Sequence, residues 1–310
     1  MVVYHTLNYT TEYYLSFKYL SFLPPSFIFI TGYLISSVYF ARATGNQSQV
    51  QQRLLIRGGK LLLLFTLLNL MASVLLRRGH SEENLNLFSF FDHWQAVYIT
   101  GTGRFAVFEV LLPIAYILIL APWLIWAGHR QRFFLPAIAV SLLVLCAFLE
   151  NSGYYFPNLN LLSAGTLGML AGLVPSQKIA ALGQYLVYTI IAYGVYFYLW
   201  TMVGQYFLVQ ILGATVAVAL IFSLCLRLQL RGWPRTQFIR LGQYSLVAYI
   251  FQIGVLQALS RLTQRPAPLS FGGLFLFAAT LLLTLLCAHL IEMARIRSST
   301  LEKLYKAVFA

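Results

Sequence analysis

The sequence has few charged residues: Asp, Glu, Lys and Arg together make up 9% of its 310 residues, whereas hydrophobic residues make up 60%. Its mean hydropathy is strongly positive. A soluble domain of this size with so little charge would not stay dispersed in water. The composition therefore excludes the soluble classes and predicts an integral membrane protein.

Cysteines and acids are also scarce. The three cysteines, Cys146, Cys225 and Cys287, all lie in apolar runs, which excludes an extracellular disulfide framework. Only 8 acids stand against 21 Lys and Arg, giving a net charge of +13. The basic residues lie in short segments between apolar runs, as charges that set membrane topology do. We therefore expect no nucleic-acid partner.

Long apolar runs of roughly 17 to 23 residues fill most of the chain, which is the length that a helix needs to cross about 30 Å of hydrocarbon. The ten-residue alternating segments of a membrane β-barrel are not seen. We therefore predict an all-α, polytopic protein with a single transmembrane domain over 1–310. The nine expected spans lie at about 24–41, 57–76, 105–127, 133–149, 159–174, 185–203, 206–226, 241–261 and 270–291.

The distribution of Lys and Arg predicts the orientation. If the segment after the first span is cytoplasmic, fifteen of the 21 lie inside. This places the N-terminus outside and the C-terminus in the cytoplasm, in the bacterial inner membrane. An exported N-terminus without a signal peptide is unusual. Either the N-terminus is translocated as a short tail, or, as we hypothesise, a first helix is missing and the chain begins late. A first helix upstream would make ten spans and place both termini inside.

Small residues and prolines mark two features of the predicted helices. Ala164, Gly168 and Gly172 recur every four residues, a pattern typical of closely packed membrane helices. Pro113 and Pro122 interrupt the third span, so we expect that this helix is kinked.

One acid, Glu109, is expected inside a span, where an ionised carboxylate is costly unless it is paired or hydrated. It is a candidate functional residue, with the alternative that it reaches the outer surface or pairs with Arg104 or Arg78. A histidine beside such an acid has the parts of a general base and its orienting group. Most of the histidines and acids are expected on the outer side: His5, Glu12, His80, Glu82, Glu83, Asp92, His93 and Glu150.

Within that outer group, His80 and His93 are expected to be solvated surface residues. No two histidines are three or four residues apart and no cysteine is near a histidine of the outer group, so we expect no metal site.

On the inner side, Arg53, Arg57 and Lys60 recur at spacings of four and three, which places three cations on one helix face. They are candidates for holding phosphate groups, with anchoring to anionic lipid head groups as the alternative. His289 and Glu292, also inside, have the spacing of a helical pair, although a single histidine there also suits the helix dipole.

Several stretches resemble the superfamily of transmembrane acyltransferases that includes the acyltransferase-3 proteins, glucan succinyltransferases and heparan-α-glucosaminide N-acetyltransferase-like proteins. The resemblance runs through SFLPPSFIFITGYLISSVYFAR, RLLIRGGKLLLL, VLLPIAYILILAPWLIW, SAGTLGMLAGLVP, LGQYSLVAYIFQIGVLQ and STLEKLYKAVF. These motifs cover most of the chain, and each is apolar.

The resemblance implies that an acyl group, expected to be acetyl, passes from cytoplasmic acyl-coenzyme A to an outward carbohydrate hydroxyl or amine. In YHTLNY, His5 matches the family's essential histidine, and the arginine that precedes it in the family would fall before Met1. Arg53, Arg57 and Lys60 would then hold coenzyme phosphates, and Glu109 would orient His5. Gln252 stands where many relatives have histidine, so no role carries over to it.

Two other classes of function stay open. A transporter or flippase of a small or lipid-linked solute would use Glu109 for proton coupling and would not consume acyl-coenzyme A. A non-catalytic relative or membrane scaffold would neither transport nor react. The expected partners are membrane lipids, acyl-coenzyme A and a glycan or other polar acceptor.

Overall fold

The computed structural model describes residues 2–7, 9–10, 20–40, 47–75, 87–102, 108–204, 206–228, 231–263, 266–267 and 270–309. The chain divides into two compact units, which are considered separately. Unit 1 contains Met1–Leu23 and Arg227–Ala310, and unit 2 contains Pro24–Leu226. The prediction of one acyltransferase-like domain over 1–310 stays a prediction.

Helices form every regular element of the described residues, as the all-α prediction requires, and no strand occurs among them. Unit 2 is built mainly from α3 (Leu23–Leu34), the π-helix η1 (Ile35–Phe40), α4 (Gln47–Leu75), α5 (Leu87–Asp92), the π-helix η2 (Gln95–Thr100), α6 (Leu111–Arg130), α7 (Phe134–Asn151), α8 (Pro157–Gly172), α9 (Ser176–Ala180), the 3₁₀ turn η3 (Ala181–Tyr185), α10 (Leu186–Val203) and α11 (Phe207–Leu228). Unit 1 holds α1 (Val2–Leu7), α12 (Trp233–Gln243), α13 (Ser245–Thr263), α14 (Phe271–Arg297) and α15 (Ser299–Phe309).

Six helices in the described residues are long and apolar enough to cross a membrane, and a seventh span results if the bent pair α12 and α13 counts as one. A multi-pass membrane protein is therefore supported, while the nine predicted spans are not confirmed. The run at 24–41 divides into the short helix α3 and η1, and the run at 159–174 gives α8 of only 16 residues. The run at 241–261 begins at an 86° bend between α12 and α13.

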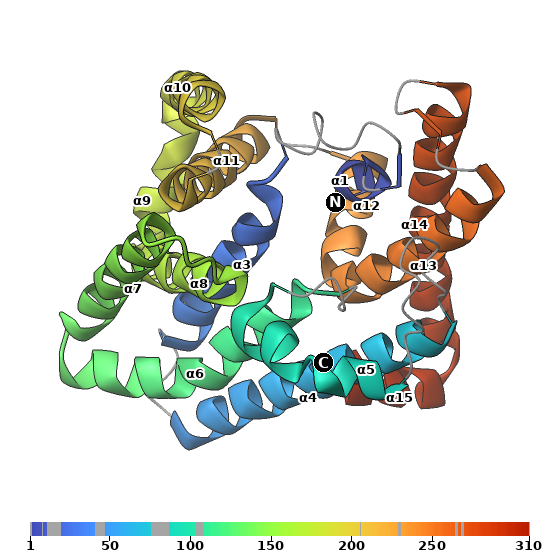
Figure 1. The fold of residues 1–310 in the computed structure, drawn as a ribbon, viewed down its shortest axis with the longest axis horizontal. Helices are drawn as coiled ribbons and strands as arrows, with labels where there is room; N and C mark the ends of the chain where they lie inside the picture. Colours follow the sequence, from blue (N-terminus) through green and yellow to red (C-terminus); the bar gives the residue numbers. More distant parts are fainter. Residues whose placement is uncertain are drawn as a thin grey trace. The chain divides into compact units, whose positions relative to one another are not determined.

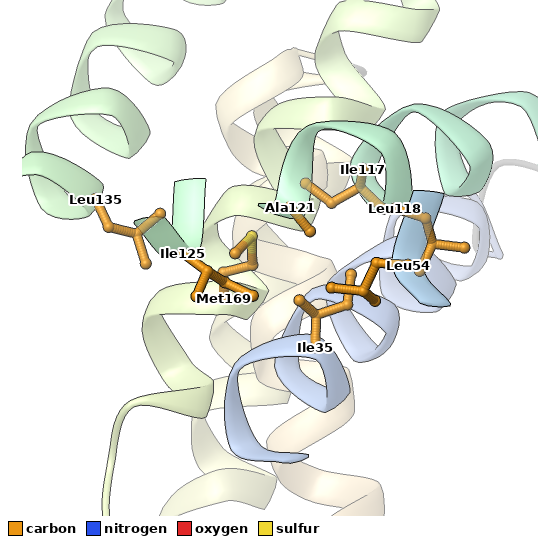
Figure 2. Packing of buried hydrophobic residues seen from close by; sticks show 8 residues of the cluster. All are labelled: Ile35, Leu54, Ile117, Leu118, Ala121, Ile125, Leu135 and Met169. Atoms are coloured by element: carbon orange, nitrogen blue, oxygen red, sulfur yellow. The ribbon is translucent and has the colours of Figure 1, made fainter. Parts of the chain in front are cut away.

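A buried apolar cluster joins five segments of unit 2 (Figure 2). The cluster holds Leu54 of α4, four residues of α6, and Ile35, Leu135 and Met169; the residues of α6 are Ile117, Leu118, Ala121 and Ile125. Because Leu54, Gly58 and Phe65 share one face of α4, this face is fixed against its neighbours. The orientation of α4 about its own axis, and so of its cations, follows from this packing.

Glycines allow α3 and α8 to pack backbone against backbone. A Cβ on Gly168 would overlap the carbonyl oxygen of Phe29, and a Cβ on Gly32 would overlap that of Gly165. The predicted small-residue contact is confirmed for Gly168 and Gly172, whose added Cβ atoms would meet α3 and η1. Ala164 instead lies in a second cluster with Cys146, Phe207 and Ile211. Gly165 takes its place on the α3 side.

The two prolines of the third predicted span differ in position. Pro122 lies inside α6, whereas Pro113 lies in its first turn, where a missing backbone N–H leaves no hydrogen bond unmade. Both are buried. The kink itself stays a prediction.

Unit 1 brings the two ends of the chain together. The short helix α1, blue in Figure 1, packs against α13 and α14, which are orange and red. The buried positions of α14 are Gly273, Leu276, Thr280, Thr284 and Ala288, spaced three and four residues apart as one helix face requires. This face and α13 enclose the residues near position five.

Candidate functional site

His5 lies buried on α1, with only 8% of its surface exposed. The ring of Tyr4 meets it edge-on at 5.2 Å between centroids, and the ring of Tyr249 from α13 lies tilted against it at 5.4 Å. The Nε2 atom is buried and has no hydrogen-bond partner among the described residues. One ring nitrogen is therefore available to another group.

The surroundings of His5 favour the neutral imidazole. Burial, followed by the positive charge of the N-terminus, lowers the pKa of His5 to about 4. Near pH 7 the ring is therefore uncharged, which is the protonation state that a general base requires. So low a pKa also makes the ring a weak proton acceptor, because general bases work best with a pKa near the working pH.

The three predicted cations lie on α4 as expected from their spacing. Arg53 and Arg57 are exposed and Lys60 is half-buried. They lie about a quarter of a turn round the helix from the buried Leu54 face, at about 100° per residue. The guanidinium of Arg57 donates a hydrogen bond from Nη1 to the hydroxyl oxygen of Tyr39 at 2.6 Å, which fixes its position. The face can therefore present several N–H donors to an anion.

Glu109 lies in a turn just before α6 and is exposed, so it is not part of the helix that the predicted span 105–127 placed it on. Residues 103–107, with the suggested partner Arg104, lie outside the described residues, and Arg78 does too. Glu109 and Glu150 both act on the phenol of Tyr155, whose pKa is raised by desolvation and then by these two carboxylates. Both carboxylates therefore lie within electrostatic range of Tyr155 in unit 2.

Glu150 has a structural role. Both oxygens of its carboxylate accept the backbone N–H of Phe207, at 2.9 and 3.0 Å, at the start of α11. A carboxylate at this position satisfies an unpaired N–H and suits the helix dipole.

The other predicted outer residues divide into two groups. Asp92 and His93 are exposed at the end of α5, in agreement with a surface position for His93. Glu12, His80, Glu82 and Glu83 lie outside the described residues. Among the residues that the structure does describe, no group of three or more His, Cys, Asp or Glu could hold a metal ion.

A polar cluster in unit 1 was missed by the sequence interpretation. Glu292 of α14 forms an ion pair with Arg240 of α12 rather than a pair with His289. One turn along α14, the guanidinium of Arg295 lies 4.2 Å from the ring centre of Tyr305 and donates to the hydroxyl oxygen of Tyr244 at 3.0 Å. The i, i+3 spacing of Glu292 and Arg295 was visible in the sequence, but the partners on α12 and α15 come from the tertiary fold. This cluster ties three helices together.

The candidate residues thus fall in both units. His5 belongs to unit 1, whereas Glu109, Arg53, Arg57 and Lys60 belong to unit 2. The pairing of Glu109 with His5 therefore stays a prediction. Comparison of the chain with models of protein families, with curated proteins and with solved structures found no match.

Proposed function

We propose that this chain is an acyl-coenzyme A-dependent membrane acyltransferase. It moves an acyl group, with acetyl as the first candidate, from cytoplasmic acyl-coenzyme A to an outward carbohydrate hydroxyl or amine. In this proposal it lies in the bacterial inner membrane with its C-terminus in the cytoplasm.

The observation that carries the proposal is the state of His5. A buried neutral imidazole with an unpartnered Nε2 is suited to accept a proton from a hydroxyl or amine. Removal of this proton makes the acceptor nucleophilic enough to attack a thioester carbonyl. A histidine kept only for packing would be expected to use both ring nitrogens in hydrogen bonds or to be replaced by an apolar side chain.

The cationic face of α4 supports a phosphate-bearing donor. Arg53 and Arg57 are exposed, and Arg57 is held in place by Tyr39. Arginine N–H groups fixed on a helix bind phosphate oxygens with defined geometry. Coenzyme A carries several such phosphate oxygens, which three cations on one face can contact together.

The proposal is tested with the full-length protein purified in detergent and incubated with radiolabelled acetyl-coenzyme A. We expect release or transfer of the label, together with protection against heat. A ligand present at 100 times its Kd stabilises a folded protein by about 2.7 kcal/mol. The absence of both binding and turnover would overturn the proposal, and pH-driven solute uptake into proteoliposomes would then favour a transporter.

Replacement of Arg57 by glutamine is expected to weaken acetyl-coenzyme A binding by about tenfold or more. A hydrogen bond from a charged donor contributes about 1.5–3 kcal/mol, and 1.4 kcal/mol corresponds to a factor of ten in Kd. The measurement is isothermal titration calorimetry in detergent. Arg235→Gln is the matched control, since Arg235 is an exposed arginine of α12 and the charge change is the same. An unchanged affinity in the Arg57 variant would assign the α4 face to lipid anchoring.

A further inference from the structure

Three side chains of unit 1 combine near-complete burial with a polar atom that has no hydrogen-bond partner in the described residues. They are His5 at 8% exposure, Gln252 at 2% and Thr280 at 0%, and the atoms are Nε2, Nε2 and Oγ1 respectively. Each unsatisfied buried polar group destabilises the folded state. Three of them within one small unit indicate a place where a ligand supplies the missing partners.

Gln252 interrupts an apolar face of α13. Ala248, Gln252 and Leu256 follow one another at intervals of four residues, and all three are buried. A leucine or methionine would fill the position of Gln252 at no desolvation cost. Packing therefore does not explain an amide here.

Gln252 lies one helical turn from a residue that contacts the candidate base. Tyr249, whose ring contacts His5, precedes Gln252 by three residues on the same helix. Residues at this spacing share a helix face, with about 5–6 Å between their Cβ atoms. The amide of Gln252 thus lies about one helical turn along α13 from the contact with His5.

Threonines on α14 give a useful comparison. Thr284 donates its hydroxyl to the carbonyl oxygen of Thr280 at 2.7 Å, the usual arrangement for a threonine in an apolar helix. The Thr280 hydroxyl makes no such bond, although it is fully buried one turn earlier. Thr280 thus differs from Thr284. Four half-buried side chains of unit 1, Ser21, Arg240, His289 and Arg295, also hold a buried polar atom without a hydrogen-bond partner in the described residues.

We propose that Gln252 is a catalytic residue whose Nε2–H donates a hydrogen bond to the carbonyl oxygen of the acyl group. This inference rests on the proposed acyltransferase function and names a second group at the same site. A neutral amide in a dry environment stabilises the negative charge that forms on this oxygen, as the donors of an oxyanion hole do. In this proposal His5 takes the proton of the acceptor, and Gln252 stabilises the carbonyl oxygen of the acyl donor.

The acyl group passes from the thioester to the acceptor hydroxyl in one addition and one elimination. His5 Nε2 takes the proton of the acceptor hydroxyl as the acceptor oxygen attacks the thioester carbon. The electron pair of the carbonyl bond moves to the carbonyl oxygen, which Gln252 holds by its hydrogen bond. When this pair returns, the carbon–sulfur bond breaks and the coenzyme thiolate leaves. The thiolate takes the proton from the His5 imidazolium. The products are the acylated acceptor and the free thiol of coenzyme A, and no oxidant or reductant is needed.

The test is Gln252→Leu in the full-length protein, with Gln257→Leu as the matched control. Gln257 lies five residues further along α13 and is half-buried. We expect that kcat for acetyl transfer falls by about 100- to 1000-fold in the Gln252 variant only. Its Kd for coenzyme A should not change. Its melting temperature should be equal to or above that of the wild type, because an unsatisfied buried group is removed.

Gln252→His, which restores an N–H donor, should recover part of the lost activity. The inference is overturned if Gln252→Leu keeps kcat within twofold of the control. It is also overturned if the melting temperature falls together with the activity, since Gln252 would then be a structural residue. Absence of turnover in the wild type would instead remove the proposed function itself and this inference with it.

Discussion

Replacement of His5 by glutamine is expected to lower acyl transfer by about 100- to 10,000-fold, the range that a positioned general base contributes. Glutamine is close to histidine in size and polarity but cannot take up a proton near neutral pH. Binding of coenzyme A should be unchanged, because the proposed phosphate contacts come from α4. Transfer is measured with radiolabelled acetyl-coenzyme A, and binding by calorimetry. His129→Gln is the control, since His129 is exposed at the end of α6.

The same variant should change how stability depends on pH. The pKa of His5 is lowered to about 4 by burial and by the N-terminal charge, whereas an unfolded histidine titrates near 6.5. Between these values the unfolded chain binds more protons. Stability from this group is therefore complete above about pH 6.5 and is lost as the pH falls toward 4, by about 1.4 kcal/mol per pH unit at most.

Melting temperatures in detergent at pH 7 and pH 5 measure this effect. The decrease in melting temperature from pH 7 to pH 5 should be smaller in His5→Gln than in the wild type or in His129→Gln. Full activity of the His5 variant would remove the base from the mechanism. An equal decrease in melting temperature in the wild type and in His5→Gln would show that His5 is hydrated in solution.

Replacement of Gly168 by alanine is expected to destabilise unit 2 by about 3 kcal/mol, the upper end of the usual range for an overpacked site. The added Cβ would overlap the backbone oxygen of Phe29, and a backbone atom held in a helix cannot move aside as a flexible side chain can. For a unit of about 200 residues this corresponds to a loss on the order of 10 °C in melting temperature. The loss is measured by thermal unfolding in detergent.

Gly59→Ala gives the matched comparison, because an added Cβ at Gly59 meets no atom within 4 Å. In a helix, alanine is favoured over glycine by about 1 kcal/mol, so this variant should be as stable as the wild type or more so. If Gly168→Ala melts at the same temperature as Gly59→Ala, the α3–α8 contact is not as close in solution.

Hydropathy predicted the long helices well. The runs at 133–149, 206–226 and 270–291 correspond to α7, α11 and α14, because each apolar run continues without a break for the whole helix. Hydropathy did not predict where an apolar run divides into two helical segments. The run at 24–41 changes from α-helix to π-helix at Ile35, and α13 is set off from α12 by a sharp bend. Such changes depend on tertiary packing and leave composition unaltered.

The candidate residues show the same limit. The helical spacing of Arg53, Arg57 and Lys60 was sufficient to place them on one face, since the period of a helix is fixed. Gln252 was set aside because the sequence interpretation compared its identity with that of relatives. Its burial and its unsatisfied amide depend on the packing of α13 against α14 and against α1, and α1 lies at the other end of the chain. The sequence did carry one signal for it, because Gln252 stands between the apolar residues Ala248 and Leu256 at intervals of four residues.

The backbone contact between α3 and α8 also bears on biosynthesis. The partners Phe29 and Gly168 are separated by roughly 140 residues, which a ribosome adds in about 10–30 s. During that time α3, with only 12 residues, has been synthesised without the helix that it packs against. Until α8 emerges, the face of α3 around Gly32 therefore waits in the nascent chain without the helix that covers it.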